Sequence, residues 1–275
     1  MTLRFPSMPE QLTKTETRIL EYIAQNTESF LFAPIGQMAR QLGISEATIS
    51  RFVRHVGCRD YKEFKQLVMN QVSFEGPAAK MAHTLNDAGR FSVENWVVKQ
   101  QHYLQKTLEG LKEEEFHRAV QAVLHAHRVF IHAKSASASL GQLLFFRLRR
   151  LGIETILLPS GGSEVLEGLS QVQNDDLVIL FSFSKVSREG RMILDYQKEV
   201  SYRTLAFYSR TFVPEEEKAD INLFVYRGQE KEYHSMSAPA ALVDALVVAV
   251  SQQMGAESAK NLSKLHQMKK RYSHK

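Results

Sequence analysis

Residues 37–56 read QMARQLGISEATISRFVRHV, and their spacing is that of two short helices joined by a tight turn. Ala39 lies where the two helices must approach closely, and Gly43 follows four residues later, at the turn. Glycine avoids the steric cost of a positive φ at such a turn. Ser45 is suited to cap the second helix, whose inward apolar residues begin with Ile49. The stretch therefore predicts a helix-turn-helix.

The outer face of the second helix is small, polar and cationic. When the apolar residues turn inward, helical periodicity leaves Arg51 and Arg54 on the outside. Such a face suits a recognition helix in the major groove of double-stranded DNA, where arginine contacts guanines or phosphates. A helical bundle with a glycine turn and no DNA partner would explain fewer of the matching positions. The predicted DNA-binding residues are Ser45, Ala47, Thr48, Ser50, Arg51, Arg54, Lys62 and Lys65.

The composition is that of an ordinary globular protein, with 44% hydrophobic and 24% charged residues in a chain of 275. The net charge of +5 is concentrated at the C-terminus, because residues 260–275 contain six Lys or Arg and no acid. That segment carries +6, so residues 1–259 sum to about −1. A basic tail could contact nucleic acid, but a solvated chain end has the same composition. We therefore assign no function to it.

Cysteine usage and apolar runs indicate the cellular compartment. Cys58 is the only cysteine, which excludes an intrachain disulfide and fits a reducing compartment. The N-terminal residues contain no apolar run of the kind found in secretory signals. The longest apolar stretch, 241–250, contains Asp244 and is too short to span a bilayer. We expect a cytoplasmic protein with no membrane partner.

Short apolar runs alternate with helix-like segments from Arg128 onward, whereas the residues before it read as helices. Strands that alternate with helices of this length predict a parallel sheet covered on both faces. The expected strands are 129–133, 154–158, 176–183, 203–209 and 221–225, and the expected helices between and after them are 137–151, 163–173, 188–200 and 236–254.

The chain is therefore expected to contain two domains: an all-α helix-turn-helix domain, then an α/β domain with a parallel sheet of about five strands flanked by helices. Residues 75–92, which contain Gly and Pro among polar residues, are expected to form a linker. The expected boundaries are 1–75 for the helix-turn-helix domain, 76–112 for the linker and a connecting helix, 113–256 for the α/β domain and 257–275 for a basic C-terminal tail.

Two serine-rich loops follow strands of the predicted α/β domain. Residues 134–139 read KSASAS and residues 182–187 read SFSKVS. In parallel sheets, ligands bind beyond the C-terminal ends of the strands, at the N-termini of the helices that follow. Hydroxyls and backbone N–H groups at such places suit a phosphate group, so we expect an anion site there.

Two segments of the N-terminal region, LTKTETRILEYIAQN at 12–26 and IGQMARQLGISEATISRFVRHVGCRDYKEFK at 35–65, resemble the pattern of the RpiR family of bacterial transcriptional regulators. The C-terminal half is similar in layout to a sugar isomerase (SIS) domain, including PEEEKAD at 214–220 and SAPAALVDAL at 237–246. The resemblance implies a homodimer or homotetramer. It also implies a palindromic DNA operator, and a small anionic metabolite such as a sugar phosphate as effector.

The two loops depart from the SIS pattern at its glycines. The first loop is usually G-x-G-x-S, and here it reads AKSAS at 133–137. The second is usually S-x-S-G-x-[ST], and here Lys185 replaces its glycine. Each lost glycine adds a Cβ near the ligand, while Lys185 could supply a cation to a phosphate or carboxylate, occupy the pocket itself, or point outward. The expected ligand-binding residues are Lys134, Ser135, Ser137, Ser182, Ser184, Lys185 and Ser187.

Three functions remain open at this point. The first is a DNA-binding regulator that senses a phosphorylated sugar or a related anionic metabolite. The second is a sugar-phosphate isomerase with a helical appendage, which would need a general base such as Glu164, Glu167 or His234. The third is a DNA-binding dimer with a vestigial pocket, which the lost glycines favour and the retained serines oppose.

No spacing in the chain selects a catalytic residue, and we expect the protein not to be an enzyme. His125, His127 and His132 could suggest a metal site, but His125 and His127 are expected to point to different sides of a helix end, and no Cys or carboxylate completes a site. We therefore expect no metal and no cofactor.

Overall fold

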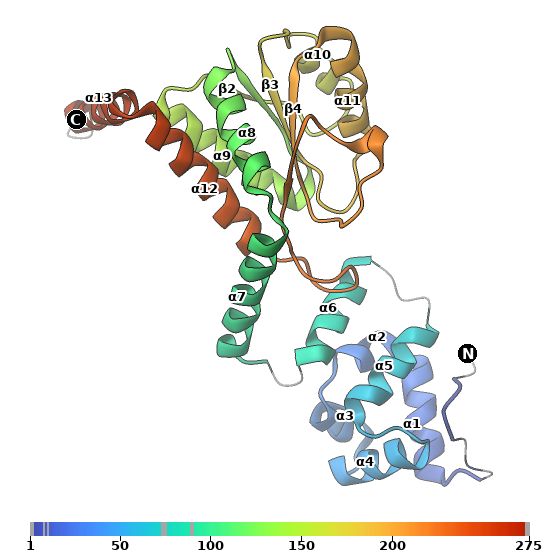
Figure 1. Ribbon diagram of the computed structural model, residues 1–275. Helices are drawn as coiled ribbons and strands as arrows, with labels where there is room; N and C mark the ends of the chain where they lie inside the picture. Colours follow the sequence, from blue (N-terminus) through green and yellow to red (C-terminus); the bar gives the residue numbers. More distant parts are fainter. Residues whose placement is uncertain (1–2, 8, 10, 73–75, 89–90, 273–275) are drawn as a thin grey trace. The chain divides into compact units, whose positions relative to one another are not determined.

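The computed structural model describes residues 3–7, 9, 11–72, 76–88 and 91–272, which form two compact units (Figure 1). The helical unit comprises Met1–Val98 together with Gly228–His234, and the α/β unit comprises Lys99–Arg227 together with Ser235–Lys275. Each unit has its own hydrophobic core, and each is described here by itself.

The helical unit is built from short amphipathic helices with recognisable caps. Thr13 begins the first of them with a capping box, in which its side chain accepts from the Glu16 N–H and Glu16 accepts in return. Phe30, Phe52 and Phe64 lie edge-to-face in the centre of this core. The helices are α1 (Lys14–Gln25), α2 (Thr27–Phe32), α3 (Ile35–Leu42), α4 (Glu46–His55), α5 (Tyr61–Gln71) and α6 (Gly76–Ala88).

The predicted linker at 75–92 is wrong for most of its length, because α6 occupies Gly76–Ala88. Ala82 is fully buried in the core formed by the preceding helices, and α6 packs on α2 and α5. Pro77 is the second residue of this helix, where the missing N–H has no intrahelical partner to lose. The Gly-Pro pair therefore begins a helix rather than a linker. Residues 75, 89 and 90 lie outside the described residues.

The α/β unit contains a five-stranded sheet of order β2-β1-β3-β4-β5, in which each neighbouring pair is parallel. The predicted parallel sheet of about five strands is confirmed, and each strand lies within its predicted range. The strands are β1 (Val129–His132), β2 (Thr155–Leu157), β3 (Leu177–Phe181), β4 (Arg203–Tyr208) and β5 (Ile221–Phe224).

Helices cover both faces of this sheet (Figure 1). One face packs against α8 (Glu113–His125), α9 (Ala138–Leu151) and α12 (Ser237–Met254), and the other against α10 (Glu164–Leu169) and α11 (Arg188–Val200). The helix α7 (Val93–Gly110) precedes α8 in the chain. Among the described residues, α12 alone is long and apolar enough to cross a membrane, and its buried side chains belong to the core of this unit.

The segment predicted as a basic tail, 257–275, is helical over its described part. The helix α13 (Ala256–Tyr272) packs on α9, where the Asn261 side chain donates to the Leu151 carbonyl at 2.7 Å. That carbonyl lies at the C-terminal end of α9, which lacks intrahelical donors for its last carbonyl groups. This contact and the packing on α9 attach the basic segment to the α/β unit. Residues 273–275 lie outside the described residues.

Candidate DNA-binding face and ligand site

The turn between α3 and α4 has the geometry that its sequence predicts. Gly43 lies in the left-handed region at φ 65°, and the Ile44 N–H donates to the Ala39 carbonyl at 3.0 Å. The Ser45 side chain caps α4 by accepting from the Thr48 N–H at 3.1 Å. The two helices therefore meet as a helix-turn-helix.

The helix α4 presents an exposed cationic face. Ala47, Arg51 and Arg54 are exposed, whereas Thr48 and Ser50 are partly buried. The Arg51 guanidinium lies within hydrogen-bond distance of the Thr48 hydroxyl, at 3.4 Å. The residues that hold the helix in the core from its other side are Ile49, Phe52 and Val53. The arrangement leaves the predicted reading face of α4 available to a partner.

Lys65 does not lie on this face, and the prediction that it is a DNA-binding residue is wrong. Its side chain is buried: Nζ donates to the Ala33 carbonyl at 3.4 Å and lies 5.9 Å from the centroid of the Tyr61 ring. Burial lowers the pKa of Lys65 to about 8. Lys65 follows Tyr61 by four residues and Phe64 by one, so it lies on the apolar side of α5. Lys62, by contrast, is exposed.

Replacing Lys65 with methionine should stabilise the helical unit by roughly 1–3 kcal/mol at pH 7, because a buried charge is removed and its apolar stem is kept. The pKa of Lys65 falls from 10.5 to about 8 on folding, so the unfolded chain binds this proton more tightly. Between pH 8 and 10.5 the folded state releases the proton first, and the advantage of the variant should shrink. Urea unfolding followed by circular dichroism at pH 7 and pH 10 measures both effects.

Lys62 provides the matched control for DNA binding. The Lys65→Met variant should bind DNA within twofold of the wild type, because the buried ammonium cannot reach a phosphate. The Lys62→Ala variant should bind DNA more weakly and show a smaller dependence of affinity on salt, by about one unit of slope per lost phosphate contact. A folded Lys65→Met protein that loses DNA affinity would contradict the buried position of Lys65.

The first serine-rich loop joins β1 to α9 at the C-terminal edge of the sheet. Ser135 takes the left-handed region at φ 56°, at the position where the SIS pattern has its second glycine. The Ser137 hydroxyl donates to the Lys134 carbonyl at 2.8 Å and accepts from the Lys134 N–H at 3.2 Å. The loop therefore keeps the backbone conformation of a glycine-containing loop although serine stands in the place of glycine.

The second loop joins β3 to α11 at the same edge. Ser187 caps α11 by accepting from the Gly190 N–H at 3.0 Å. Ser182 is buried, whereas Ser184 and Lys185 are exposed. The thirteen-residue helix α11 thus begins directly after the three serines. Its N-terminus carries unpaired N–H groups and a partial positive charge, which favour the binding of an anion.

An ion pair joins the first loop to the helix that follows the second loop. The Lys134 ammonium lies 3.0 Å from Oε1 of Glu189, which belongs to the first turn of α11. The Glu189 carboxylate accepts its own backbone N–H and is bonded by Lys134, and these contacts lower its pKa to about 2 despite desolvation. Gly161 of the β2–α10 loop passes close to both groups. The β1–α9 loop, the β2–α10 loop and the first turn of α11 therefore meet around one ion pair.

The sequence interpretation missed Glu189 and also a second charged residue of this edge, Arg227. The Arg227 guanidinium is buried, donates to the Ser184 hydroxyl at 3.2 Å and stacks over the Phe183 ring at 4.0 Å. Burial lowers the pKa of Arg227 to about 10, so it stays charged at neutral pH. No local pattern identifies Arg227, because it follows β5 and lies 43 residues from Ser184 in the sequence. Lys134, Lys185 and Arg227 thus bring positive charge to the two serine-rich loops.

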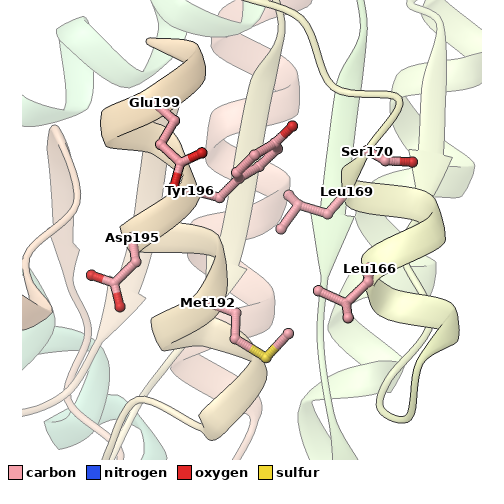
Figure 2. Close-up of a pocket in the computed structure, with 7 residues that line it drawn as sticks. All are labelled: Leu166, Leu169, Ser170, Met192, Asp195, Tyr196 and Glu199. Atoms are coloured by element: carbon pink, nitrogen blue, oxygen red, sulfur yellow. The ribbon is translucent and has the colours of Figure 1, made fainter.

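A separate groove of about 420 Å³ lies between α10 and α11 (Figure 2). It has an apolar floor and acidic side chains on the α11 side, and none of the predicted ligand-binding residues lines it. Its lining residues are Leu166, Leu169, Ser170, Met192, Asp195, Tyr196 and Glu199.

One group of described residues has the spacing of metal ligands: His127, Asp175 and Asp176, at the N-terminal edge of the sheet. The expectation that no carboxylate lies beside these histidines is therefore wrong, because the fold brings residues 175 and 176 next to 127. Asp176 is committed to other bonds, because Arg128 contacts both of its oxygens at 3.1 and 2.7 Å. His132 lies at the opposite end of β1 from His127, so the histidines considered in the sequence do not form one site. We assign no metal to this group.

Two family models match the chain. A helix-turn-helix domain of the rpiR family matches residues 1–75, and a SIS domain matches residues 123–249. An uncharacterised HTH-type transcriptional regulator of Clostridium perfringens is 22% identical over 254 residues, which cover 90% of each chain. The combination of the two domains therefore extends over most of the length of this relative.

Solved structures share the fold. The sugar isomerase domain of an RpiR transcription factor from Sphaerobacter thermophilus has a TM-score of 0.58 and 23% identity, and it covers 62% of this chain and 96% of its own. The Vibrio vulnificus NanR protein, solved in complex with ManNAc-6P, has a TM-score of 0.58 and 20% identity over 94% of each chain. At these identities the likeness establishes the fold.

Proposed function

Because the chain belongs to the rpiR family of helix-turn-helix transcriptional regulators and carries a SIS domain, we propose that it binds a palindromic operator and senses a sugar phosphate or a related anionic metabolite. In this proposal it acts in the cytoplasm as a homodimer or homotetramer, has no catalytic activity and uses no cofactor. The helical unit binds the DNA, and the α/β unit binds the effector.

The exposed face of α4 supports the DNA-binding role. Arg51 and Arg54 project from a helix that is capped at Ser45 and held from behind by buried apolar side chains. In this role the arginines contact base edges or phosphates in the major groove, while Ala47 and Ser50 allow a close approach. Lys62, at the start of α5, would add a contact with the DNA backbone.

The single observation that carries the effector role is the clustering of hydroxyls and cations at one edge of the sheet. Ser137, Ser184 and Ser187 lie in two loops that precede α9 and α11, and Lys134 and Arg227 bring positive charge to the same loops. A phosphate bound there would gain backbone N–H donors, hydroxyls and a helix N-terminus together. The NanR protein, which has this fold, was solved with a sugar phosphate, and this supports the proposed class of ligand.

An effector acts on DNA binding only if it prefers one of two states of the protein. A coupling of about 1–3 kcal/mol is typical, which corresponds to a change of 5- to 150-fold in DNA affinity. Exposed apolar side chains on α9 and α12, Phe146 and Val248, are compatible with a dimer contact in this unit. Light scattering at micromolar concentration measures the oligomeric state.

A thermal-shift screen tests the effector role. Glucose 6-phosphate, glucosamine 6-phosphate, N-acetylmannosamine 6-phosphate, their unphosphorylated forms and simple organic acids would be compared. A ligand at a hundredfold excess over its Kd stabilises the folded state by about 2.7 kcal/mol, so a phosphorylated sugar should raise the Tm selectively. Conversion of the bound sugar, followed by NMR, would favour an isomerase instead. The absence of any shift in a folded sample would contradict the effector role.

A further inference from the structure

His132 is a polar side chain that is buried in the α/β unit. It ends β1 and is 3% exposed, neither ring nitrogen makes a hydrogen bond of good geometry among the described residues, and the backbone of Pro159 is a polar group that acts on its pKa. Side chains alternate along a strand, so His132 faces the same side as Phe130, which packs toward α10 and α11. Burial lowers the pKa of His132, and the ring is therefore neutral at pH 7, with one donor and one acceptor.

The Glu189 carboxylate, which acts on the pKa of His132, also has a buried oxygen. Oε1 is bonded by Lys134, and the carboxylate also interacts with its own backbone N–H and the Ser187 hydroxyl, whereas Oε2 is buried and makes no hydrogen bond of good geometry within the described part of the chain. Glu189 and Lys134 are close enough to His132 to act on its pKa in opposite directions. A buried ionised oxygen without a donor is costly, and native structures rarely keep one without a reason.

The backbone of the β2–α10 loop lies close to the Lys134–Glu189 ion pair. A Cβ added at Gly161 would lie 3.4 Å from Glu189 Oε1 and 3.7 Å from Lys134 Nζ, so the glycine backbone passes directly over the ion pair. Gly162 has φ 79°, a conformation that other residues rarely adopt. A larger side chain at position 161 would crowd the Lys134–Glu189 ion pair, whereas a Cβ at Gly162 meets no atom within 4 Å.

We propose that His132 and Glu189 are specificity-determining residues of the ligand site, and that they bind the hydroxyl groups of a sugar phosphate while Lys134 and the serine loops hold its phosphate. Hydroxyls can donate to Glu189 Oε2 and both donate to and accept from His132. The ligand is therefore a phosphate ester with hydroxyls near the anion, rather than a simple anion. This inference rests on the proposed function, because it assigns parts of the same site.

The test compares the affinity for a sugar phosphate with that for inorganic phosphate. Isothermal titration calorimetry would measure both in the wild-type chain, in Glu189→Gln and in His132→Gln, with glucose 6-phosphate, glucosamine 6-phosphate and N-acetylmannosamine 6-phosphate as probes. We compare the ratio of the affinity for the best sugar phosphate to the affinity for inorganic phosphate. In each variant this ratio should be at least tenfold smaller than in the wild type, because the substituted side chain no longer matches the hydroxyl groups of the sugar. In Glu189→Gln, inorganic phosphate should bind equally well or more tightly, since a competing negative charge is removed.

Glu199→Gln is the matched control, because it removes the same charge from the exposed far end of α11. The preference of Glu199→Gln for a sugar phosphate over inorganic phosphate should equal that of the wild type. A decrease in this preference as large as that in Glu189→Gln would overturn the proposal. An unchanged preference in folded Glu189→Gln and His132→Gln would also overturn it and leave Glu189 as a counter-ion of Lys134. If no sugar phosphate binds to the wild type, the proposed function itself is wrong, and this outcome is distinct from an unchanged preference.

Discussion

The Arg51→Ala variant should lose specific operator binding, with a decrease in affinity of at least about 30-fold. One bidentate arginine contact with a guanine contributes roughly 1–3 kcal/mol of discrimination, and a dimer on a palindrome makes the contact twice. Arg51 is exposed on α4 and contributes nothing to the buried side of that helix. Its removal should therefore change binding without changing stability, as measured by fluorescence anisotropy and by thermal unfolding of the same sample.

Arg59 is the control for this prediction. It is highly exposed, pairs with Asp60 at 3.4 Å and lies outside α4, so Arg59→Ala removes the same charge away from the reading face. Its operator affinity should stay within about threefold of the wild type. A folded Arg51→Ala protein with full operator affinity would exclude Arg51 from the interface.

The Arg128→Met variant should lower the stability of the α/β unit by about 3–5 kcal/mol, since it leaves the Asp176 carboxylate buried without its cation. Asp176 is 1% exposed, and Arg128 contacts both of its oxygens. For a domain of this size the loss corresponds to a decrease in Tm of roughly 6–20 °C. Differential scanning calorimetry measures it.

Lys198 provides the comparison on the surface. Its ammonium lies 2.9 Å from Asp195, and both side chains are mostly exposed. Lys198→Met should change the free energy of unfolding by less than about 1 kcal/mol, because water screens an exposed pair. Equal effects of the two substitutions would show that burial does not determine the strength of the Arg128–Asp176 pair.

Local signals allowed much of the fold to be predicted from the sequence. The cap at Ser45, the turn at Gly43 and the helical period of α4 are each determined within a few residues, and the structure has them as expected. The strands were recognisable because both faces of a parallel sheet are buried and the runs are continuously apolar. Lys65 could have been placed correctly as well, because its spacing from Tyr61 puts it on the apolar stripe of α5.

The missed features depend on contacts between distant parts of the chain. The Lys134–Glu189 pair joins residues 55 apart, and no local pattern distinguishes that glutamate from other acids in a first helical turn. The Gly-Pro pair at the start of α6 was interpreted as a linker, because a proline near a helix N-terminus and a proline in a loop look alike until the packing of Ala82 is known. The sequence therefore predicted the two serine-rich loops of the candidate site but not the charged groups Glu189 and Arg227 beside them.

The most direct test of the central claim combines DNA selection with the effector. The full-length protein would be used to select fragments of the genome of its source organism, and binding to the selected sequence would be titrated with and without N-acetylmannosamine 6-phosphate, glucose 6-phosphate and glucosamine 6-phosphate. We predict a palindromic site and a change in its Kd of at least fivefold with one of these sugar phosphates but not with its unphosphorylated sugar. Failure to enrich any sequence, or a selected site whose affinity none of these compounds changes, would contradict a regulator that couples DNA binding to a sugar phosphate.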